Sequence, residues 1–374
     1  MRVLLTGGGT AGHINPALAI AETIRYNDPH AEIEFVGIAG GKENDLVPRE
    51  GYRLHHVKSM GLRRSLSPSN IKALYLALFS PYFKSTTSIL DTFKPDIVIG
   101  TGGYACWPLM AAAARRGIPT AVHESNALPG LAVKQLQKRV DRIWINFEAT
   151  REKLRTSRPI VRVGNPMKQA FGATSYAAAR EALGIPKDTT FILSFGGSLG
   201  AEAINRAVVD FMGTQGKDRK NLLHLHASGK RDYAETKAQF DAQGLQDSRS
   251  CILQDYIYDM PMQMAAADIV IARAGAMTLS ELALWQKACV LIPSPHVADN
   301  HQYKNAKAVA DAGAALLLQE SELTPGVLTD AVRALMEDPA RRASLSSAFR
   351  TFAVENANEL IYSDAKRLVI SRKM

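Results

Sequence analysis

The amino-acid sequence predicts an α/β protein with two doubly wound parallel-sheet domains. Short apolar runs typical of buried strands alternate with helical patterns along almost all of the 374 residues. Parallel strands need crossover helices that cover both faces of the sheet, so this alternation indicates parallel sheets. It falls into two series, one in each half of the chain. At roughly 100–200 residues per domain, the length also favours two domains.

The expected strands are short apolar runs rich in β-branched residues. In the first half they cover residues 2–6, 32–37, 53–57, 96–100, 119–123, 142–146 and 160–163. In the second half they cover residues 190–195, 222–226, 251–254, 268–272 and 288–292. Helical periodicity occupies the segments between them, for example 16–26, 107–116, 202–212, 278–286, 302–312 and 326–336. Residues 340–374 predict two further helices and no strand.

The domain boundary is expected at Gly164-Asn165-Pro166, directly after the last strand of the first series. Asn-Pro is typical of turns, and a residue before proline disfavours the helical region. We therefore expect a first domain over residues 1–164 and a second domain from residue 165 onward.

The composition excludes several classes of protein. Hydrophobic residues make up 46% and charged residues 22% of the chain, which excludes a disordered chain and a collagen-like chain. The formal charge of +9 and the sequence pI of about 9.4 suit an anionic partner: a nucleic acid, a phosphorylated substrate or an anionic membrane. The sequence carries no helix-turn-helix, RNP, KH or zinc-finger pattern, so a nucleic acid is not expected.

The cysteines and the N-terminus bear on the compartment. Cys106, Cys251 and Cys289 lie far apart and match no disulfide framework or zinc spacing, which favours a reducing, cytoplasmic environment. The apolar run at the N-terminus is too short for a signal peptide. No stretch of about 18 apolar residues is present, so a transmembrane helix is not expected.

Each half has a glycine-rich turn directly after a strand, at residues 6–13 (TGGGTAGH) and 195–201 (FGGSLGA). Glycine lets backbone N–H groups approach an oxyanion, and the following helix presents its positive end. The two loops therefore favour anion binding, although glycine also serves tight structural turns. The first loop formally matches GxGxxG, but the second strand ends at residues 35–40 (FVGIAG) without the acidic residue of a dinucleotide site, so NAD and FAD are disfavoured.

His13 follows the first glycine loop at the start of a helix. A histidine there either faces solvent or lies at the mouth of an anion site. In the second case it could donate to a phosphate or exchange a proton.

Several motifs together resemble those of the MurG family of N-acetylglucosaminyltransferases. The similar segments, in chain order, are residues 8–13 (GGTAGH), 102–104 (GGY), 117–119 (GIP), 123–126 (HESN), 164–166 (GNP), 196–201 (GGSLGA), 273–281 (RAGAMTLSE) and 296–305. They span about residues 3–320 in consistent order. The sequence departs from the family pattern at Ala11, Ser125, Lys168, Leu199 and Glu202.

The resemblance implies the glycosyltransferase-B fold, in which two Rossmann-like domains face each other across a cleft. The sugar-nucleotide donor would bind residues 165–356, and the acceptor would bind residues 1–164, joined by a helix at about 357–374. The implied reaction is the inverting transfer of N-acetylglucosamine from UDP-N-acetylglucosamine to the 4-hydroxyl of lipid I, which forms lipid II in peptidoglycan synthesis. The implied location is the cytoplasmic face of the inner membrane. Another nucleotide-sugar transferase or an epimerase of the same fold is the alternative.

The resemblance also implies roles for individual residues. The carboxylate of Glu281 would accept hydrogen bonds from the donor ribose, as well as interacting favourably with its helix dipole. His13 and Glu124 are the two candidates for the general base, and the sequence does not choose between them. Substrate binding is implied for Thr10, Ala11, Gly12, Asn126, Lys168, Ser198, Ile257, Ala276, Met277, Thr278, Leu279, Ser280, Glu281 and Gln302.

Ile257 and Gln302 each have a plain alternative. Ile257 is either the residue whose backbone reads the uracil edge or an ordinary buried strand residue. Gln302 either binds sugar hydroxyls or is a polar residue at the start of a helix.

No protein-bound metal is expected, because no DxD-like motif follows a strand. Backbone amides and a helix N-terminus could neutralise the leaving diphosphate instead. An assisting divalent ion is compatible with this interpretation.

Residues 63–84 have the composition of a membrane-surface segment. No acidic residue occurs between Glu50 and Asp91, and an apolar helical face runs through Ile71, Leu74, Leu78 and Tyr82. A basic segment beside an apolar helix suits an anionic membrane surface. The alternative is a helix that packs on the sheet of the first domain.

Overall fold

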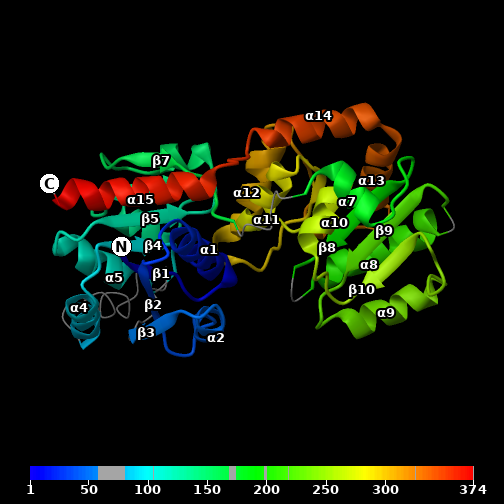
Figure 1. The fold of residues 1–374 in the computed structure, drawn as a ribbon. Coiled ribbons are helices and arrows are strands. Elements are labelled where there is room, and N and C mark those ends of the chain that lie inside the picture. The colour runs from blue at the N-terminus through cyan, green and yellow to red at the C-terminus, as the bar shows by residue number, and fades with distance from the viewer. Residues whose placement is uncertain are drawn as a thin grey trace. The chain divides into compact units, whose positions relative to one another are not determined.

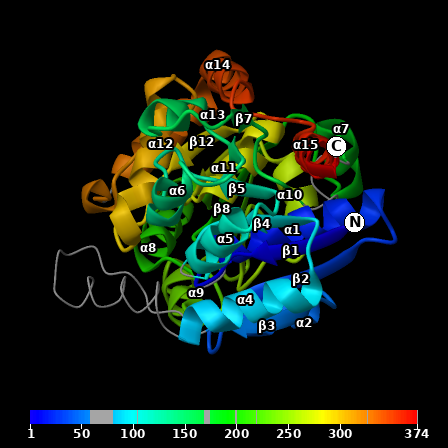
Figure 2. The same cartoon turned by 90° about the vertical axis from the view of Figure 1, so that its left-hand side faces the viewer.

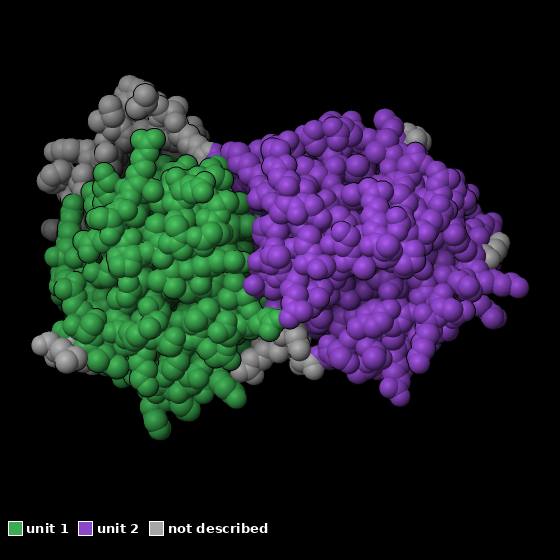
Figure 3. Space-filling view, turned by 90° about the horizontal axis from the view of Figure 1, so that it is seen from above, with its two compact units in different colours: residues 1–168, 354–374 green, residues 169–353 purple. Residues whose placement is uncertain are grey.

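The computed structural model describes residues 1–57, 81–103, 105–167, 174–197, 200–217, 219–324 and 326–373. It confirms the predicted α/β class, with one seven-stranded and one six-stranded sheet whose described strand pairs are all parallel. The chain divides into two compact units, shown in different colours in Figure 3. Unit 1 contains residues 1–168 and 354–374, and unit 2 contains residues 169–353.

The sheet of unit 1 has the order β3-β2-β1-β4-β5-β6-β7 (Figure 1). Its strands are β1 (Arg2–Thr6), β2 (Glu32–Ile38), β3 (Arg53–Val57), β4 (Ile97–Gly100), β5 (Thr120–Glu124), β6 (Arg142–Ile145) and β7 (Ile160–Arg162). From β1 the chain adds β2 and β3 on one side, and from β4 it adds β5, β6 and β7 on the other side. The strand order therefore reverses between the neighbouring strands β1 and β4. In open α/β sheets, the crevice at such a reversal, beyond the carboxyl ends of the strands, is where ligands bind.

Helices cover both faces of this sheet because its strands are apolar on both sides. Val3 and Leu5 belong to the core that includes α1 (Ala11–Asn27) and α15 (Ala357–Lys373), whereas Leu4 belongs to the core that includes α5 (Cys106–Arg115). The remaining described helices of unit 1 are α2 (Glu43–Arg49), α4 (Pro81–Phe93), α6 (Leu131–Leu136) and the 3₁₀ helix η1 (Glu148–Lys153). α1 begins five residues before the expected start at residue 16, because its exposed first turn carries no apolar periodicity.

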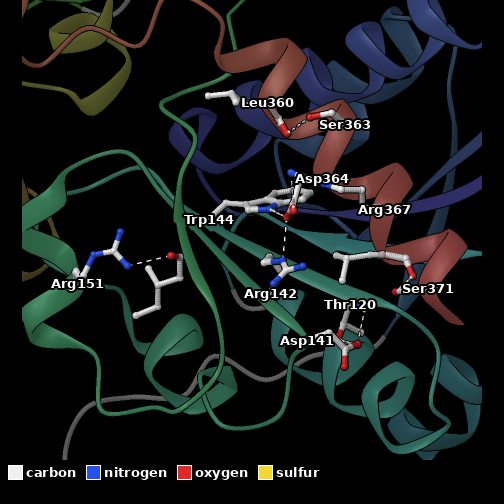
Figure 4. A network of polar contacts seen from close by, with 12 residues as sticks. Thr120, Asp141, Arg142, Trp144, Arg151, Leu360, Ser363, Asp364, Arg367 and Ser371 are labelled. Atoms are coloured by element: carbon white, nitrogen blue, oxygen red, sulfur yellow. Dashed lines mark hydrogen bonds and ion pairs between the residues drawn. The ribbon is translucent and has the colours of Figure 1, made fainter.

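The C-terminal helix α15 belongs to unit 1 and packs beside α1 (Figures 1 and 2). The buried carboxylate of Asp364 accepts hydrogen bonds from Arg142 Nε at 2.9 Å and from Trp144 Nε1 at 2.8 Å, as Figure 4 shows. Where the chain leaves and re-enters the unit, Met167 N donates to Asn358 Oδ1 at 3.1 Å and Asn358 Nδ2 donates to Met167 O at 2.7 Å. The end of the chain is thus tied to unit 1 by both apolar and polar contacts.

The sheet of unit 2 has the order β10-β9-β8-β11-β12-β13. Its strands are β8 (Thr190–Phe195), β9 (Leu222–Ala227), β10 (Cys251–Gln254), β11 (Ile269–Ala272), β12 (Ala288–Leu291) and β13 (Leu316–Leu317). β13 was not expected, since two residues are too few to show a strand period. Its partner β12 supplies the edge on which it pairs.

The described helices of unit 2 connect these strands. They are α7 (Tyr176–Ala182), α8 (Glu202–Phe211), α9 (Tyr233–Ala242), α10 (Met260–Ala266), α11 (Ala276–Leu284), α12 (His301–Asp311), α13 (Val327–Glu337) and α14 (Pro339–Arg350), with the short helices η2 (Met212–Gly216), η3 (Ala298–Asn300) and η4 (Glu320–Glu322). One apolar core joins α8 and α13 to β8, β11 and β12. No described helix is both long and apolar enough to cross a membrane.

Candidate active site

The first glycine loop lies at the carboxyl end of β1, and close packing requires glycine at two of its positions. A Cβ at Gly7 would lie 2.0 Å from Thr101 Oγ1, and a Cβ at Gly8 would lie 2.5 Å from Glu43 Oε1. Gly9 has a φ of 83° and donates its N–H to Glu43 Oε2 at 3.1 Å. Close packing and a positive φ are thus sufficient to explain why glycine occupies these three positions, with or without a bound ligand.

His13 joins the loops that follow β1 and β4. Its Nδ1 lies 3.2 Å from Gly8 O and 3.2 Å from Thr10 Oγ1. Thr101 Oγ1 donates to the carbonyl of His13 at 2.6 Å. Gly102, with a φ of 106°, passes so close to the imidazole that a Cβ there would lie 2.7 Å from Cδ2. The ring is thereby held in one orientation at the switch point of the sheet.

Thr10, Ala11 and Gly12 form the exposed start of α1. Thr10 is the N-cap residue, but its hydroxyl makes no capping hydrogen bond to the helix. The positive end of a 17-residue helix is therefore presented at the surface beside His13.

Glu124 ends β5, and its carboxylate organises the loop that follows. Oε1 accepts hydrogen bonds from Asn126 N at 3.0 Å and Asn126 Nδ2 at 3.1 Å, and Oε2 accepts one from Gly130 N at 2.7 Å. Burial raises the pKa of Glu124, while these three hydrogen bonds oppose that shift. The partly buried Asn126 is thus fixed directly by the carboxylate.

His123 precedes Glu124 and connects β5 to the GNP turn. Its Nε2 lies 2.8 Å from Gly164 O, and Ser125 Oγ lies 3.3 Å from Nδ1. Burial lowers the pKa of His123 to about 4, so the ring is neutral near pH 7. His123 is a structural histidine within the motif that the sequence singled out.

The second glycine loop follows β8. Gly197 and Gly200 have φ values of 99° and 87°, and a Cβ at Gly200 would lie 2.3 Å from the carbonyl oxygen of Ser228. Glycine is required there because the loop rests directly on the β9–α9 connection.

The N-terminus of α11 contributes part of the predicted donor site. Gly275 is the N-cap residue, and Met277 and Thr278 in the first turn are partly buried. Leu279 lies in the core, while the buried Ser280 donates its hydroxyl to Ala276 O at 3.2 Å. The side chains of Leu279 and Ser280 are therefore occupied by packing and by the helix itself, which leaves the first-turn amides as groups that could contact a ligand.

Glu281 lies in the second turn of α11 and is partly buried. Within the described residues, no hydrogen bond or ion pair reaches its carboxylate. Burial raises the pKa of Glu281 to about 8. A buried carboxylate without donors is stabilised by a ligand that supplies them.

Ile257 lies between β10 and α10, with its side chain 2% exposed. Its neighbours Tyr256 and Tyr258 are exposed, with ring centroids 5.0 Å apart, and Lys230 Nζ lies 5.6 and 5.5 Å from the two rings. This aromatic and cationic cluster is not predicted by any motif in the sequence, because its members come from two separate loops.

Gln302 lies in the first turn of α12, and its Oε1 accepts a hydrogen bond from Ser294 N at 2.9 Å. The helix begins after two successive residues with left-handed backbone, Asp299 and Asn300, at φ values of 60° and 52°. Asp and Asn adopt this conformation more readily than other non-glycine residues, because their short polar side chains can hydrogen-bond locally. The hydrogen bond from Ser294 N holds the side-chain amide of Gln302 in place through its oxygen.

A buried polar network links β8, β9 and α8 below the second glycine loop. Ser194 Oγ lies 2.8 Å from His224 Nε2 and 2.9 Å from His226 Nδ1, and His226 Nε2 lies 3.1 Å from Asn205 Oδ1. Asn205 Nδ2 donates to Ser228 O at 3.0 Å. Burial lowers the pKa of His226 to about 4. The network fixes the carbonyl against which Gly200 packs.

Some of the predicted positions lie outside the described residues. These are Tyr104, Lys168, Ser198, Leu199 and residues 63–80 of the membrane segment, and the side chains of residues 81–84 are not described either. Within the described part of the chain, no group of three or more histidine, cysteine or acidic side chains could hold a metal ion.

Comparison with known proteins places this chain among glycosyltransferases. Residues 3–145 match the glycosyltransferase family 28 N-terminal domain, and residues 191–372 match the glycosyltransferase family 28 C-terminal domain.

Two curated relatives carry the name UDP-N-acetylglucosamine–N-acetylmuramyl-(pentapeptide) pyrophosphoryl-undecaprenol N-acetylglucosamine transferase. The relative from Acetivibrio thermocellus is 39% identical over 369 residues, which cover 99% of this chain and 98% of the relative. The relative from Thermoanaerobacter sp. strain X514 is 38% identical over 368 residues, which cover 98% of this chain and 100% of the relative. The crystal structure of Acinetobacter baumannii MurG matches with a TM-score of 0.79 and 28% identity, and covers 98% of this chain and 99% of that one.

Proposed function

This chain belongs to the MurG family of N-acetylglucosamine transferases, and we propose that it transfers N-acetylglucosamine from UDP-N-acetylglucosamine to the 4-hydroxyl of an undecaprenyl-linked N-acetylmuramyl acceptor. The observation that carries this function is the 39% identity over 99% of the chain to a transferase of that name. The product of this reaction is lipid II, a precursor of peptidoglycan.

The donor site belongs to unit 2. The diphosphate binds the second glycine loop with Ser198 and the first-turn amides of α11. The uracil edge is read by the backbone at Ile257, beside the exposed ring of Tyr256. Glu281 accepts hydrogen bonds from the ribose hydroxyls, and Gln302 binds the sugar. Two observations support this assignment. Within the described residues no hydrogen bond or ion pair reaches the partly buried carboxylate of Glu281, and the side chains of Leu279 and Ser280 are occupied by packing and by the helix itself.

The reaction is a displacement at the anomeric carbon. The bond between this carbon and the UDP oxygen breaks, and a bond to the acceptor oxygen forms on the opposite face with inversion. Negative charge grows on the leaving diphosphate while the sugar becomes oxocarbenium-like. Backbone amides and the positive end of a helix stabilise that charge without reorganising.

The acceptor site belongs to unit 1, where the 4-hydroxyl must lose a proton. We assign the role of the general base that accepts this proton to His13, which lies beside the exposed start of α1. Glu124 is the weaker candidate, because its two oxygens already accept three hydrogen bonds from its own loop. Its role is to hold Asn126 toward the acceptor, and Thr10, Ala11 and Gly12 contact the acceptor at the start of α1.

The acceptor is a lipid-linked molecule, so the enzyme has to work at a membrane surface. We assign surface docking to residues 63–84, on the basis of their basic and apolar composition. The protein would then be peripheral to the cytoplasmic face of the inner membrane.

UDP release tests the proposed function. The purified protein should release UDP from UDP-N-acetylglucosamine only when a lipid-linked muramyl acceptor is present, and the product should gain one N-acetylhexosamine by mass. UDP release that needs no acceptor, or conversion of the free sugar nucleotide to its epimer, would contradict the transferase function.

A further inference from the structure

We propose that Glu43 is a positioning residue for His13 and acts through the peptide group that joins Gly8 to Gly9. The role in catalysis rests on the proposed function, because it assumes that His13 accepts the acceptor proton. The effect on the imidazole itself does not depend on that assumption.

Glu43 is the first residue of α2, and it is 1% exposed. Its carboxylate bridges the loops after β1 and β2: Oε2 accepts a hydrogen bond from Gly9 N at 3.1 Å, and Oε1 accepts one from Ile38 N at 3.0 Å. Among the described residues no cation pairs with this carboxylate. Its hydrogen-bond partners in this part of the chain are two backbone N–H groups.

The surrounding chain is built to admit this carboxylate. A Cβ at Gly8 would lie 2.5 Å from Oε1, one at Gly37 would lie 2.6 Å from Cγ, and one at Gly41 would lie 2.4 Å from Oε2. Gly8 and Gly41 lie in the loops after β1 and β2, and Gly37 lies near the end of β2. Together the three glycines leave the space that the Glu43 side chain fills. A side chain that needs such space from three positions is a specific part of the loop architecture.

The same peptide group contacts His13 on its other side. The N–H of Gly9 points to Glu43, and the carbonyl oxygen of Gly8 lies 3.2 Å from His13 Nδ1. A carbonyl oxygen can only accept, so this geometry assigns the imidazole proton to Nδ1 and the lone pair to Nε2. Nε2 is then the atom able to accept a proton.

A carboxylate at the N–H end of a peptide group increases the negative charge on its carbonyl oxygen, because hydrogen bonds in a chain polarise one another. The polarised Gly8 oxygen favours the Nδ1–H tautomer. It also stabilises the positive charge that grows on His13 when Nε2 takes a proton. This is the effect of a carboxylate that bonds directly to a histidine, relayed here by one peptide group.

The same contact restricts anion binding by the first loop. The N–H of Gly9 is already donated to a buried carboxylate, whose charge opposes a phosphate at that point. An acceptor anion is therefore directed to the start of α1 and away from Gly8 and Gly9. The first glycine loop thus positions the base, and the N–H of Gly9 is already occupied by Glu43.

The first experiment measures the tautomer of His13 without substrate. In protein labelled with ¹⁵N at histidine, the His13 signals are identified by their loss in His13→Gln. We expect a protonated Nδ1 and an unprotonated Nε2 in the wild type, and a mixture of tautomers in Glu43→Gln. An Nε2–H tautomer in the wild type, or an unchanged tautomer in a folded Glu43→Gln protein, would overturn the proposal.

The second experiment compares kinetics with a matched control. Glu43→Gln should lower kcat by about 10–100-fold, the range seen when a metal-binding histidine loses its carboxylate partner, with the KM for the donor within about twofold. Glu34→Gln removes a nearby carboxylate that pairs with His55 and Arg53 and does not contact the loop, and its kcat should stay within about twofold. On a His13→Ala background, Glu43→Gln should have less than about a twofold further effect, because residues that act as a unit are not additive.

A full multiplicative loss on that background would show that Glu43 acts independently of His13. If Glu43→Gln does not fold, Glu43→Asp provides the same comparison, because it keeps the charge but is too short to reach both N–H groups. The wild-type tautomer is measured in either case. If that tautomer is as expected but UDP release needs no acceptor, the proposed function fails while the link between Glu43 and His13 stands.

Discussion

The indole of Trp144, in β6, donates a 2.8 Å hydrogen bond to the carboxylate of Asp364, 220 residues later in α15. Both side chains are buried, and Arg142 Nε donates to the same carboxylate at 2.9 Å (Figure 4). The last helix is therefore part of the core of unit 1, although the chain forms all of unit 2 before it returns. The core of unit 1 is therefore complete only when α15 packs against it.

Replacing Asp364 should loosen α15. In Asp364→Ala, the guanidinium of Arg142 and the indole N–H of Trp144 lose a buried partner, which typically costs about 3–5 kcal/mol. Hydrogen exchange of α15 peptides under mild denaturant should report this loss. The control is Asp311→Ala, which removes an exposed pair with Lys307 and should leave the stability close to that of the wild type, because exposed ion pairs contribute little. Equal effects of the two variants would remove any special role for Asp364.

Donor affinity should depend on the ionisation of Glu281. Its pKa is raised to about 8 by burial, and ribose hydroxyls that donate to the carboxylate favour the charged form and lower this pKa in the complex. Below about pH 8 binding must therefore release a proton, so affinity for UDP-N-acetylglucosamine should rise from pH 6.5 to 8 and then level off. Calorimetry in two buffers of different ionisation enthalpy measures the released proton. Proton uptake on binding would contradict this role.

Truncating the same residue tests its contribution directly. Glu281→Ala should weaken donor binding by about 1.5–3 kcal/mol, the range for hydrogen bonds to a charged group, and its affinity should no longer vary with pH in this range. A folded Glu281→Ala protein with wild-type affinity would exclude Glu281 from the ribose site.

Acid should destabilise unit 2 through His226. Burial lowers its pKa to about 4 in the folded state, against about 6.5 when unfolded. The unfolded chain therefore binds a proton that the native chain does not, so stability is full above pH 6.5 and falls by roughly 3 kcal/mol for this group as pH drops to 4. Urea unfolding at several pH values should show a shallower decline for His226→Gln. The exposed His30 offers a control, since His30→Gln should leave the decline unchanged.

The segment at residues 63–84 should mediate vesicle binding. Each basic residue near an anionic surface contributes about 1 kcal/mol, and the attraction is screened over about 8–10 Å, so cosedimentation with anionic vesicles should fall as salt rises. Replacing Leu78 and Phe79 by serine, and Lys72 and Lys84 by glutamate, should release the protein while donor affinity is kept. Cosedimentation equal to the wild type would place the docking surface elsewhere.

The sequence by itself determined the fold class, twelve of the strand positions and the motif loops. These features are local: burial on both faces gives continuous apolar runs, and a turn requires glycine or proline at that position. β13 was missed, because Leu316–Leu317 becomes a strand only through its pairing with β12. His13 and Glu281 could also be chosen as candidate site residues from the sequence, because each lies in a short continuous motif, at residues 8–13 and 273–281.

Only the tertiary structure decided which residues are partners. Glu43 lies 34 residues from Gly9, and the two meet because β1 and β2 are neighbours whose loops end at the same edge of the sheet. The same holds for Trp144 and Asp364. Local patterns record whether a residue is buried or lies in a turn, but the atom that it contacts depends on strand order and on where the chain returns. For this reason the sequence could present the first glycine loop as an anion cradle, while the structure places a carboxylate behind it.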